Sequence, residues 1–150
     1  MKNKMIVGID GSACAEHALA WALNNVCKGT ADIQLVCCWE RPLLIDATGL
    51  ATTVLTDEQL AAQAQQSIDH ALEELAAEVE AVRAGGGSVT SRVMMGAPDD
   101  VLESESEHAD CLVIGRRGHS KLAKLLGTVS RHVADNAKCP VVVVPEGPQS

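Results

Sequence analysis

Short apolar runs alternate with longer amphipathic segments along the chain, and this pattern predicts alternating strands and helices. The runs from Lys4 to Ile9 (KMIVGI) and from Ile33 to Trp39 are almost unbroken. Unbroken apolar runs are typical of strands in a parallel sheet that is covered on both faces. Further strands are expected at residues 89–95, 111–114 and 141–144, and helices at 13–26, 57–84, 98–107 and 128–136.

Local signals mark where two of the helices begin. Asp10-Gly11-Ser12 supplies a turn and helix N-caps, and Thr56-Asp-Glu-Gln59 has the form of a capping box. Residues 40–56 are long for a loop and are expected to form a lid or a partly helical segment. One stripe at spacings of three and four, about 34 Å long, predicts a single long helix after the capping box. Its members are Leu60, Ala64, Ile68, Leu72, Leu75, Val79 and Val82.

The order of these elements predicts an α/β fold with three layers, α/β/α, around a five-stranded parallel sheet. We expect one domain over residues 1–150, with 146–150 as a loose tail, because no repeat or linker interrupts the pattern. Such sheets bind ligands at the carboxyl ends of their strands, where the strand order reverses. Asp10, Trp39 and Gly115 should therefore gather at one edge.

Composition limits the classes of binding partner and the location that the chain is expected to have. The net charge of -8 and the presence of only two aromatic residues, both Trp, argue against nucleic acid or an anionic membrane. No apolar stretch approaches the ~20 residues of a membrane span, and the N-terminal run is too short for a signal sequence, so we expect a cytosolic protein. The six cysteines form no metal-binding pattern and are expected to be reduced, small apolar side chains.

Gly115-Arg-Arg-Gly118, followed by Gly127-Thr-Val-Ser130, indicates a phosphate site. It follows an apolar strand, its glycines let the backbone approach an anion, and the first N–H groups of a helix have no internal partner. No carboxylate lies between Asp110 and Asp135, whereas five basic residues do. This stretch is a local reversal of charge in an acidic protein.

Three familiar phosphate-binding types do not match. The chain contains no GxxxxGK[ST] string, and it lacks the dinucleotide glycines after the first strand, where only Gly8 and Gly11 occur. A receiver domain would need an Asp after the third strand, which instead ends in Met95-Gly96.

The remaining combination resembles the universal stress protein family over essentially the whole chain. The resemblance rests on IVGIDGS, GAPDDVL, VIGRRG and GTVSRHVADNAKCPVVVVP, and on the nucleotide signature G-x2-G-x9-G-[ST]. Gly115, Gly118 and Gly127-Thr128 fit this signature, although eight residues rather than nine separate Gly118 from Gly127. The resemblance implies a Rossmann-like fold of the adenine nucleotide alpha hydrolase-like type.

The resemblance further implies a site for ATP or AMP, with Mg2+ or Mn2+ able to bridge the phosphates. Asp10 would meet the ribose, Cys38 the adenine, and Thr128 a phosphate. Asp10 and Thr128 are alternatively helix N-caps, and Arg117 is alternatively part of a solvated loop. His119 is a further candidate near phosphate. The full set of expected binding residues is Gly8, Ile9, Asp10, Cys38, Ile114, Gly115, Arg117, Gly118, Gly127, Thr128 and Val129.

The resemblance also implies a homodimer formed through the edge strand Val141–Val144. The expected function is a nucleotide-responsive stress regulator or sensor with at most slow ATP hydrolysis, because no obvious base is present to position water. One alternative is a nucleotide-independent dimeric interaction protein, which the eight-residue spacing favours. A less favoured alternative is a phosphoryl or nucleotidyl transferase, for which only Asp10 and His119 qualify as catalytic groups.

Overall fold

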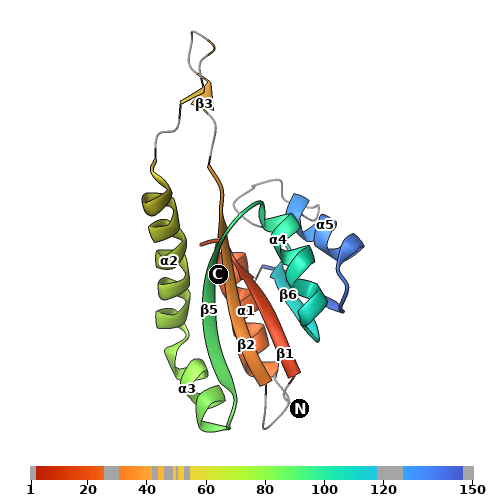
Figure 1. Cartoon of the computed structure of the whole chain (residues 1–150). Coiled ribbons are helices and arrows are strands. Elements are labelled where there is room, and N and C mark those ends of the chain that lie inside the picture. The colour runs from red at the N-terminus through yellow and green to blue at the C-terminus, as the bar shows by residue number, and fades with distance from the viewer. Residues whose placement is uncertain are drawn as a thin grey trace.

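A parallel sheet forms the centre of the molecule (Figure 1). The computed structural model describes residues 3–25, 31–41, 44–45, 49, 51–52, 55–117 and 127–146. Among them, five strands form one sheet in the order β5-β2-β1-β6-β7, and every neighbouring pair is parallel, as predicted. These strands are β1 (Asn3–Ile9), β2 (Ala31–Trp39), β5 (Ser88–Met95), β6 (Cys111–Gly115) and β7 (Val141–Val144).

Helices cover both faces of this sheet, which confirms the three-layer prediction (Figure 1). On one face lie α1 (Ala13–Asn25), α2 (Asp57–Glu74) and α3 (Ala76–Ala84). On the other face lie α4 (Pro98–Glu105), a 3-10 turn (Ser106–His108) and α5 (Thr128–Asn136). A separate antiparallel pair is formed by β3 (Leu44–Ile45) and β4 (Ala51–Thr52).

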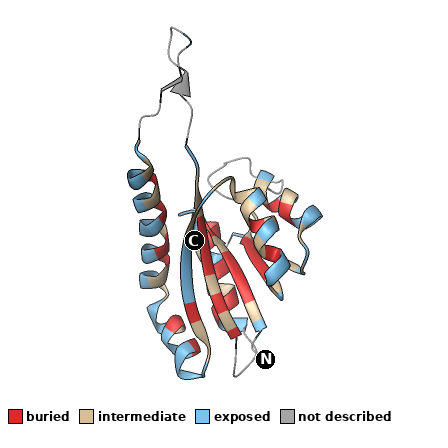
Figure 2. Ribbon diagram, in the orientation of Figure 1, coloured by how far each residue is buried: buried red, intermediate tan, exposed pale blue. Residues whose placement is uncertain are grey.

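The core is aliphatic and divided by the sheet into two clusters (Figure 2). Successive residues of a strand point to opposite faces, so Val7 packs in the α1–α3 cluster while its neighbour Ile6 packs in the α4–α5 cluster. Both side chains are fully buried. The same alternation places Cys37 and Cys38 on opposite faces, as expected. Each fully buried Ile or Val side chain contributes roughly 1.5–3 kcal/mol.

The prediction of one long helix after residue 56 is wrong in one respect, because two helices, α2 and α3, occupy this segment. The capping box is present, because Thr56 Oγ1 accepts from Gln59 N at 3.2 Å and Gln59 Oε1 accepts from Thr56 N at 2.9 Å. At Leu75, however, the backbone leaves the helical region, with φ -114° and ψ 28°. The apolar stripe continues through this break, since Ile68 and Val79 are buried on either side of it. Residues 40–56, expected to form a lid or a partly helical segment, lie partly outside the described residues, and their described part contains the β3–β4 pair rather than a helix.

The strand order places the reversal point between β1 and β6. These two strands are neighbours, with Val7 opposite Val113, yet β2 and β5 lie beyond β1 while β7 lies beyond β6. The chain therefore leaves β1 and β6 in opposite directions, which opens a crevice at their carboxyl ends. In the described part of the chain, no helix has the length and apolar character that crossing a bilayer requires.

Candidate functional site

A cavity of about 290 Å³ lies at the carboxyl ends of β1 and β6, at the reversal point. The structure brings together here every expected binding residue that it describes; Gly118 and His119 lie outside the described residues. Sequence reasoning missed part of the lining, namely Ala15, Val36, Pro98, Leu102 and Ser130. Trp39, expected at the same edge, does not line the cavity and packs against the α1–α3 cluster.

One side of the cavity is apolar. Val36 and Cys38 from β2, Leu102 from α4 and Ile114 from β6 form this wall. Burial, together with the nearby Cys37, Glu105 and Glu40, raises the pKa of the Cys38 thiol to about 12, so it is a neutral group at pH 7. Gly8 lets Leu102 pack closely against β1, because a Cβ there would lie 3.2 Å from Leu102 Cδ1. The wall suits a flat apolar group.

A second part of the lining is the N-terminus of α5. Thr128, Val129 and Ser130 are the first residues of this helix, and all three line the cavity. Their N–H groups have no acceptor within the helix, and the helix dipole adds partial positive charge at this end. Gly127 caps the helix, and its N–H donates instead to Arg116 O at 2.9 Å. This side suits an anion.

A buried hydroxyl fixes the distance between β6 and α5. Ser130 Oγ lies 2.9 Å from Gly115 O and 2.8 Å from Arg116 O, so its single proton is shared between two carbonyls. Sequence reasoning saw no special role for Ser130. The available signal was a hydroxyl residue in the first turn of the helix that follows the glycine stretch. A hydroxyl at that position can donate to the carbonyls at the end of the strand.

The turn after β1 places Asp10 beside the cavity without making it the helix cap. The carboxylate of Asp10 accepts from Ser12 N at 2.9 Å and from the Ser12 hydroxyl. Ser12 Oγ in turn accepts from Ala15 N at 3.2 Å, which makes Ser12 the N-cap of α1. Asp10 is therefore positioned by the turn, and its side chain is exposed at the cavity.

Gly115 is required by packing against α1. A Cβ at this position would lie 2.9 Å from the carbonyl carbon of Cys14, a backbone atom that cannot move away alone. By contrast, a Cβ on Gly127 would meet its nearest neighbours at 3.5 Å, an ordinary contact. Packing therefore requires a glycine at position 115, whereas a Cβ at position 127 would fit.

Arg117 is the one cationic residue of the described cavity lining. Its side chain is 13% exposed, and its Nη2 lies 2.8 Å from Glu146 Oε1, just beyond β7. Its Nε is buried, and no described residue provides a hydrogen-bond acceptor for it. Of the five basic residues between Asp110 and Asp135, Lys121 and Lys124 lie outside the described residues.

Comparison with known proteins decides the family. The model of the "Universal stress protein family" matches residues 1–145. The chain belongs to the universal stress protein family. Universal stress protein Rv3134c of Mycobacterium tuberculosis is 31% identical over 144 residues, which cover 96% of this chain and 49% of the relative. The chain spans about half the length of the first curated relatives it matches.

Two solved structures share the fold. A universal stress protein in complex with cAMP has a TM-score of 0.60 at 24% identity, covering 97% of this chain and 98% of that one. A universal stress protein family protein from Arabidopsis thaliana with AMP bound has a TM-score of 0.55 at 21% identity, covering 97% and 92%. At these identities, the likeness establishes the fold of this universal stress protein.

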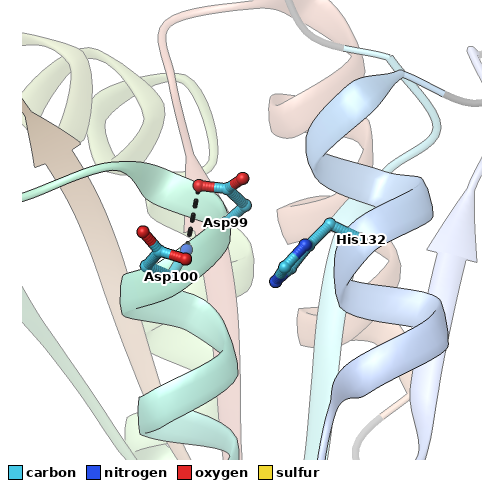
Figure 3. Close-up of side chains that lie close together, drawn as sticks. All are labelled: Asp99, Asp100 and His132. Atoms are coloured by element: carbon cyan, nitrogen blue, oxygen red, sulfur yellow. Dashed lines mark hydrogen bonds between the residues drawn. The ribbon is translucent and has the colours of Figure 1, made fainter.

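A second group of polar side chains lies between α4 and α5 (Figure 3). Ligand atoms of Asp99, Asp100 and His132 lie within 4.8 Å of one another. The two carboxylates stand in the first turn of α4, where negative charge stabilises a helix, and Asp99 Oδ1 accepts from Asp100 N. His132 Nε2 lies 3.0 Å from Glu103 Oε2. This pair joins α5 to α4.

The packing of Gly115 predicts that replacing Gly115 destabilises this universal stress protein more than replacing Gly127 does. Gly115→Ala should lower the free energy of unfolding by about 2 kcal/mol or more, because the added Cβ overlaps backbone. Gly127→Ala should change it by less than about 1 kcal/mol, because the contact is ordinary and the residue already has φ -60°. Urea unfolding of both variants measures this. Equal costs would contradict it.

The His132–Glu103 pair predicts a pH-dependent contribution to stability. The hydrogen bond to Glu103, with Asp99 and Asp100 nearby, raises the pKa of His132 above its ordinary value. The stabilisation is therefore present below the unfolded-state pKa and is lost as pH rises through the folded-state pKa. Wild type should exceed His132→Gln in Tm at about pH 5.5 and lose that advantage by about pH 8.5. His108→Gln, at an exposed position, is the control; a constant difference would contradict the prediction.

Proposed function

We propose that this chain binds ATP or AMP and acts as a nucleotide-responsive regulator or sensor in the cytoplasm, of the stress-response type. The observation that carries this proposal is one cavity whose lining includes both an apolar wall and a helix N-terminus. Adenosine has a flat, largely apolar base, and its phosphates are anions, so the two sides match the two ends of an adenine nucleotide.

The positions of the lining residues support a specific orientation. Adenine would lie against the wall that contains Cys38 and Ile114, and the ribose hydroxyls would donate to the Asp10 carboxylate. The phosphates would accept from the first amides of α5, from the Thr128 hydroxyl and from the Arg117 guanidinium. Family members with bound AMP and bound cAMP support an adenine nucleotide as the ligand class.

Fast hydrolysis is not expected. Among the described lining residues, Asp10 is the only carboxylate, and it already accepts hydrogen bonds from Ser12. The Cys38 thiol is neutral at pH 7 and cannot act as a base there. Mg2+ or Mn2+ would accompany ATP and neutralise part of its phosphate charge. The site would therefore hold nucleotide rather than turn it over rapidly.

A proline at the start of α5 tests the phosphate end of the site. Proline is favoured at the first position of a helix, and Gly127 already has the extended conformation that proline requires before it. Thr128→Pro should therefore fold normally while losing one amide donor and one hydroxyl. Equilibrium titration should show ATP and AMP binding weakened about 10-fold or more, because hydrogen bonds to charged groups contribute roughly 1.5–3 kcal/mol.

Thr128→Val separates the two losses, because it removes the hydroxyl and retains the amide. Adenosine affinity should change by less than about 2-fold in both variants, and thermal unfolding should verify the fold. Absence of ATP and AMP binding to the wild type at millimolar concentration, with Mg2+ present, would contradict the proposal. That result would favour the nucleotide-independent interaction protein.

We further propose a homodimer in which β7 pairs with β7 of a second copy. This strand is at the edge of the sheet formed by the described residues, and an apolar edge favours pairing with another strand. The carbonyls of Pro140 and Val144 accept from Leu112 N in β6 and from Arg116 N just after it. By the alternation of a strand, the backbone groups of Val141 and Val143 then point to the open edge.

Val143→Pro tests this dimer with little effect on the sheet itself. Proline is tolerated on an edge strand where its missing N–H faces outward. Wild type should be a dimer by light scattering at about 10 µM, and Val143→Pro should be a monomer with its secondary structure retained. A monomeric wild type would overturn the proposed assembly.

A further inference from the structure

One ion pair connects the cavity to the end of the sheet's edge strand. Arg117 leaves β6 two residues beyond Gly115 and lines the cavity, whereas Glu146 follows β7 after Pro145. Arg117 Nη2 lies 2.8 Å from Glu146 Oε1. The one arginine of the described lining therefore has a carboxylate from another part of the chain as its partner.

This pairing leaves the arginine partly unsatisfied. A guanidinium presents five N–H donors in a planar fork, which suits an anion with several oxygens. Glu146 engages Nη2, while the buried Nε has no acceptor among the described residues. An unpaired buried donor is costly. The single contact to Glu146 therefore leaves the guanidinium less than fully satisfied, and Glu146 does not hold it as a bidentate partner would.

The two members of the pair differ in exposure. The Arg117 side chain is 13% exposed, whereas that of Glu146 is 37% exposed and can regain water easily. Contact with water weakens the attraction that an ion pair provides, and the Glu146 carboxylate retains that contact. Moving Glu146 away is therefore inexpensive, whereas moving Arg117 out of the cavity lining would disturb packing. A competing anion would displace the glutamate and leave the arginine in place.

We propose that Glu146 is an internal competitor for Arg117, displaced when the phosphate group of a bound nucleotide enters the cavity. This inference rests on the proposed function, because it assigns the regulation of that same site. Carboxylate and phosphate carry like charge, and one guanidinium beside an apolar wall cannot hold both at full strength. Glu146 therefore lowers affinity for phosphate-bearing ligands and leaves adenosine unaffected.

The exchange also couples ligand binding in the cavity to the contacts at the end of the edge strand β7. Arg116 N donates to Val144 O at 2.8 Å, and Cys14 Sγ donates to the same carbonyl at 3.4 Å. The end of β7 is thus fixed to the glycine stretch just before Pro145 and Glu146. Release of Glu146 changes the contacts of the residues directly after β7, and only a ligand with a phosphate group causes it.

The test compares ligands that differ in phosphate content. Titrations of wild type, Glu146→Gln, Arg117→Met and the double variant use ATP, AMP, pyrophosphate and adenosine. Glu146→Gln should bind ATP, AMP and pyrophosphate about 2–5-fold more tightly, because it no longer competes for the guanidinium. Adenosine affinity should not change. In the Arg117→Met background, the added Glu146→Gln change should have no effect on any ligand.

Glu80→Gln is the matched control, because Glu80 pairs with an arginine, Arg83, on α3 away from the cavity. It should leave all affinities unchanged. If wild type binds ATP but Glu146→Gln binds it no more tightly, the competitor role is overturned and the proposed function stands. An equal gain for adenosine, or a gain that persists with Arg117→Met, also overturns the role. If no protein binds any of these ligands, both proposals fail.

Discussion

The hydroxyl of Ser130 is the contact on which the site depends. It bonds to the carbonyls of Gly115 and Arg116, and Gly127 N donates to the same Arg116 carbonyl. These bonds fix the start of α5 against the end of β6. Together with the packing of Val133 in the α4–α5 cluster, they position the first amides of α5. Gly115 completes the arrangement, because the absence of its side chain lets the first turn of α1 approach β6.

Charge distribution makes this geometry selective. The chain carries a net charge of -8, so an anion is repelled by most of its surface. The N-terminus of α5 and Arg117 provide the local positive potential that offsets this repulsion. The neutral thiol of Cys38 leaves the apolar wall without charge. A ligand with an apolar part and an anionic part therefore satisfies both sides of the cavity, which neither a cation nor a purely apolar molecule would do.

Periodicity predicted the layers, the parallel sheet and the bounds of β7 and α5, because each of those elements is a continuous pattern bounded by glycine or proline. It did not predict the break at Leu75, which changes backbone dihedrals without interrupting the apolar stripe. Strand ends and the family resemblance placed the candidate residues at one edge. The wall formed by Val36 and Leu102 was missed, because these are ordinary core residues whose position at a cavity depends on how α4 packs on β2. Gly115 was predicted for a phosphate, whereas its packing against Cys14 is what requires a glycine.

The central claim is that a phosphate group contacts the N-terminus of α5 while adenine lies on the apolar wall that contains Cys38 and Ile114. Backbone amide NMR of the labelled protein, titrated with AMP and then with adenosine, tests this claim most directly. AMP should shift the amides of Thr128, Val129 and Ser130 together with those of the β1 turn near Asp10. Adenosine should shift the β1 turn and leave the α5 amides nearly unchanged. Equal shifts of the α5 amides with both ligands, or shifts confined to other elements, would contradict the account.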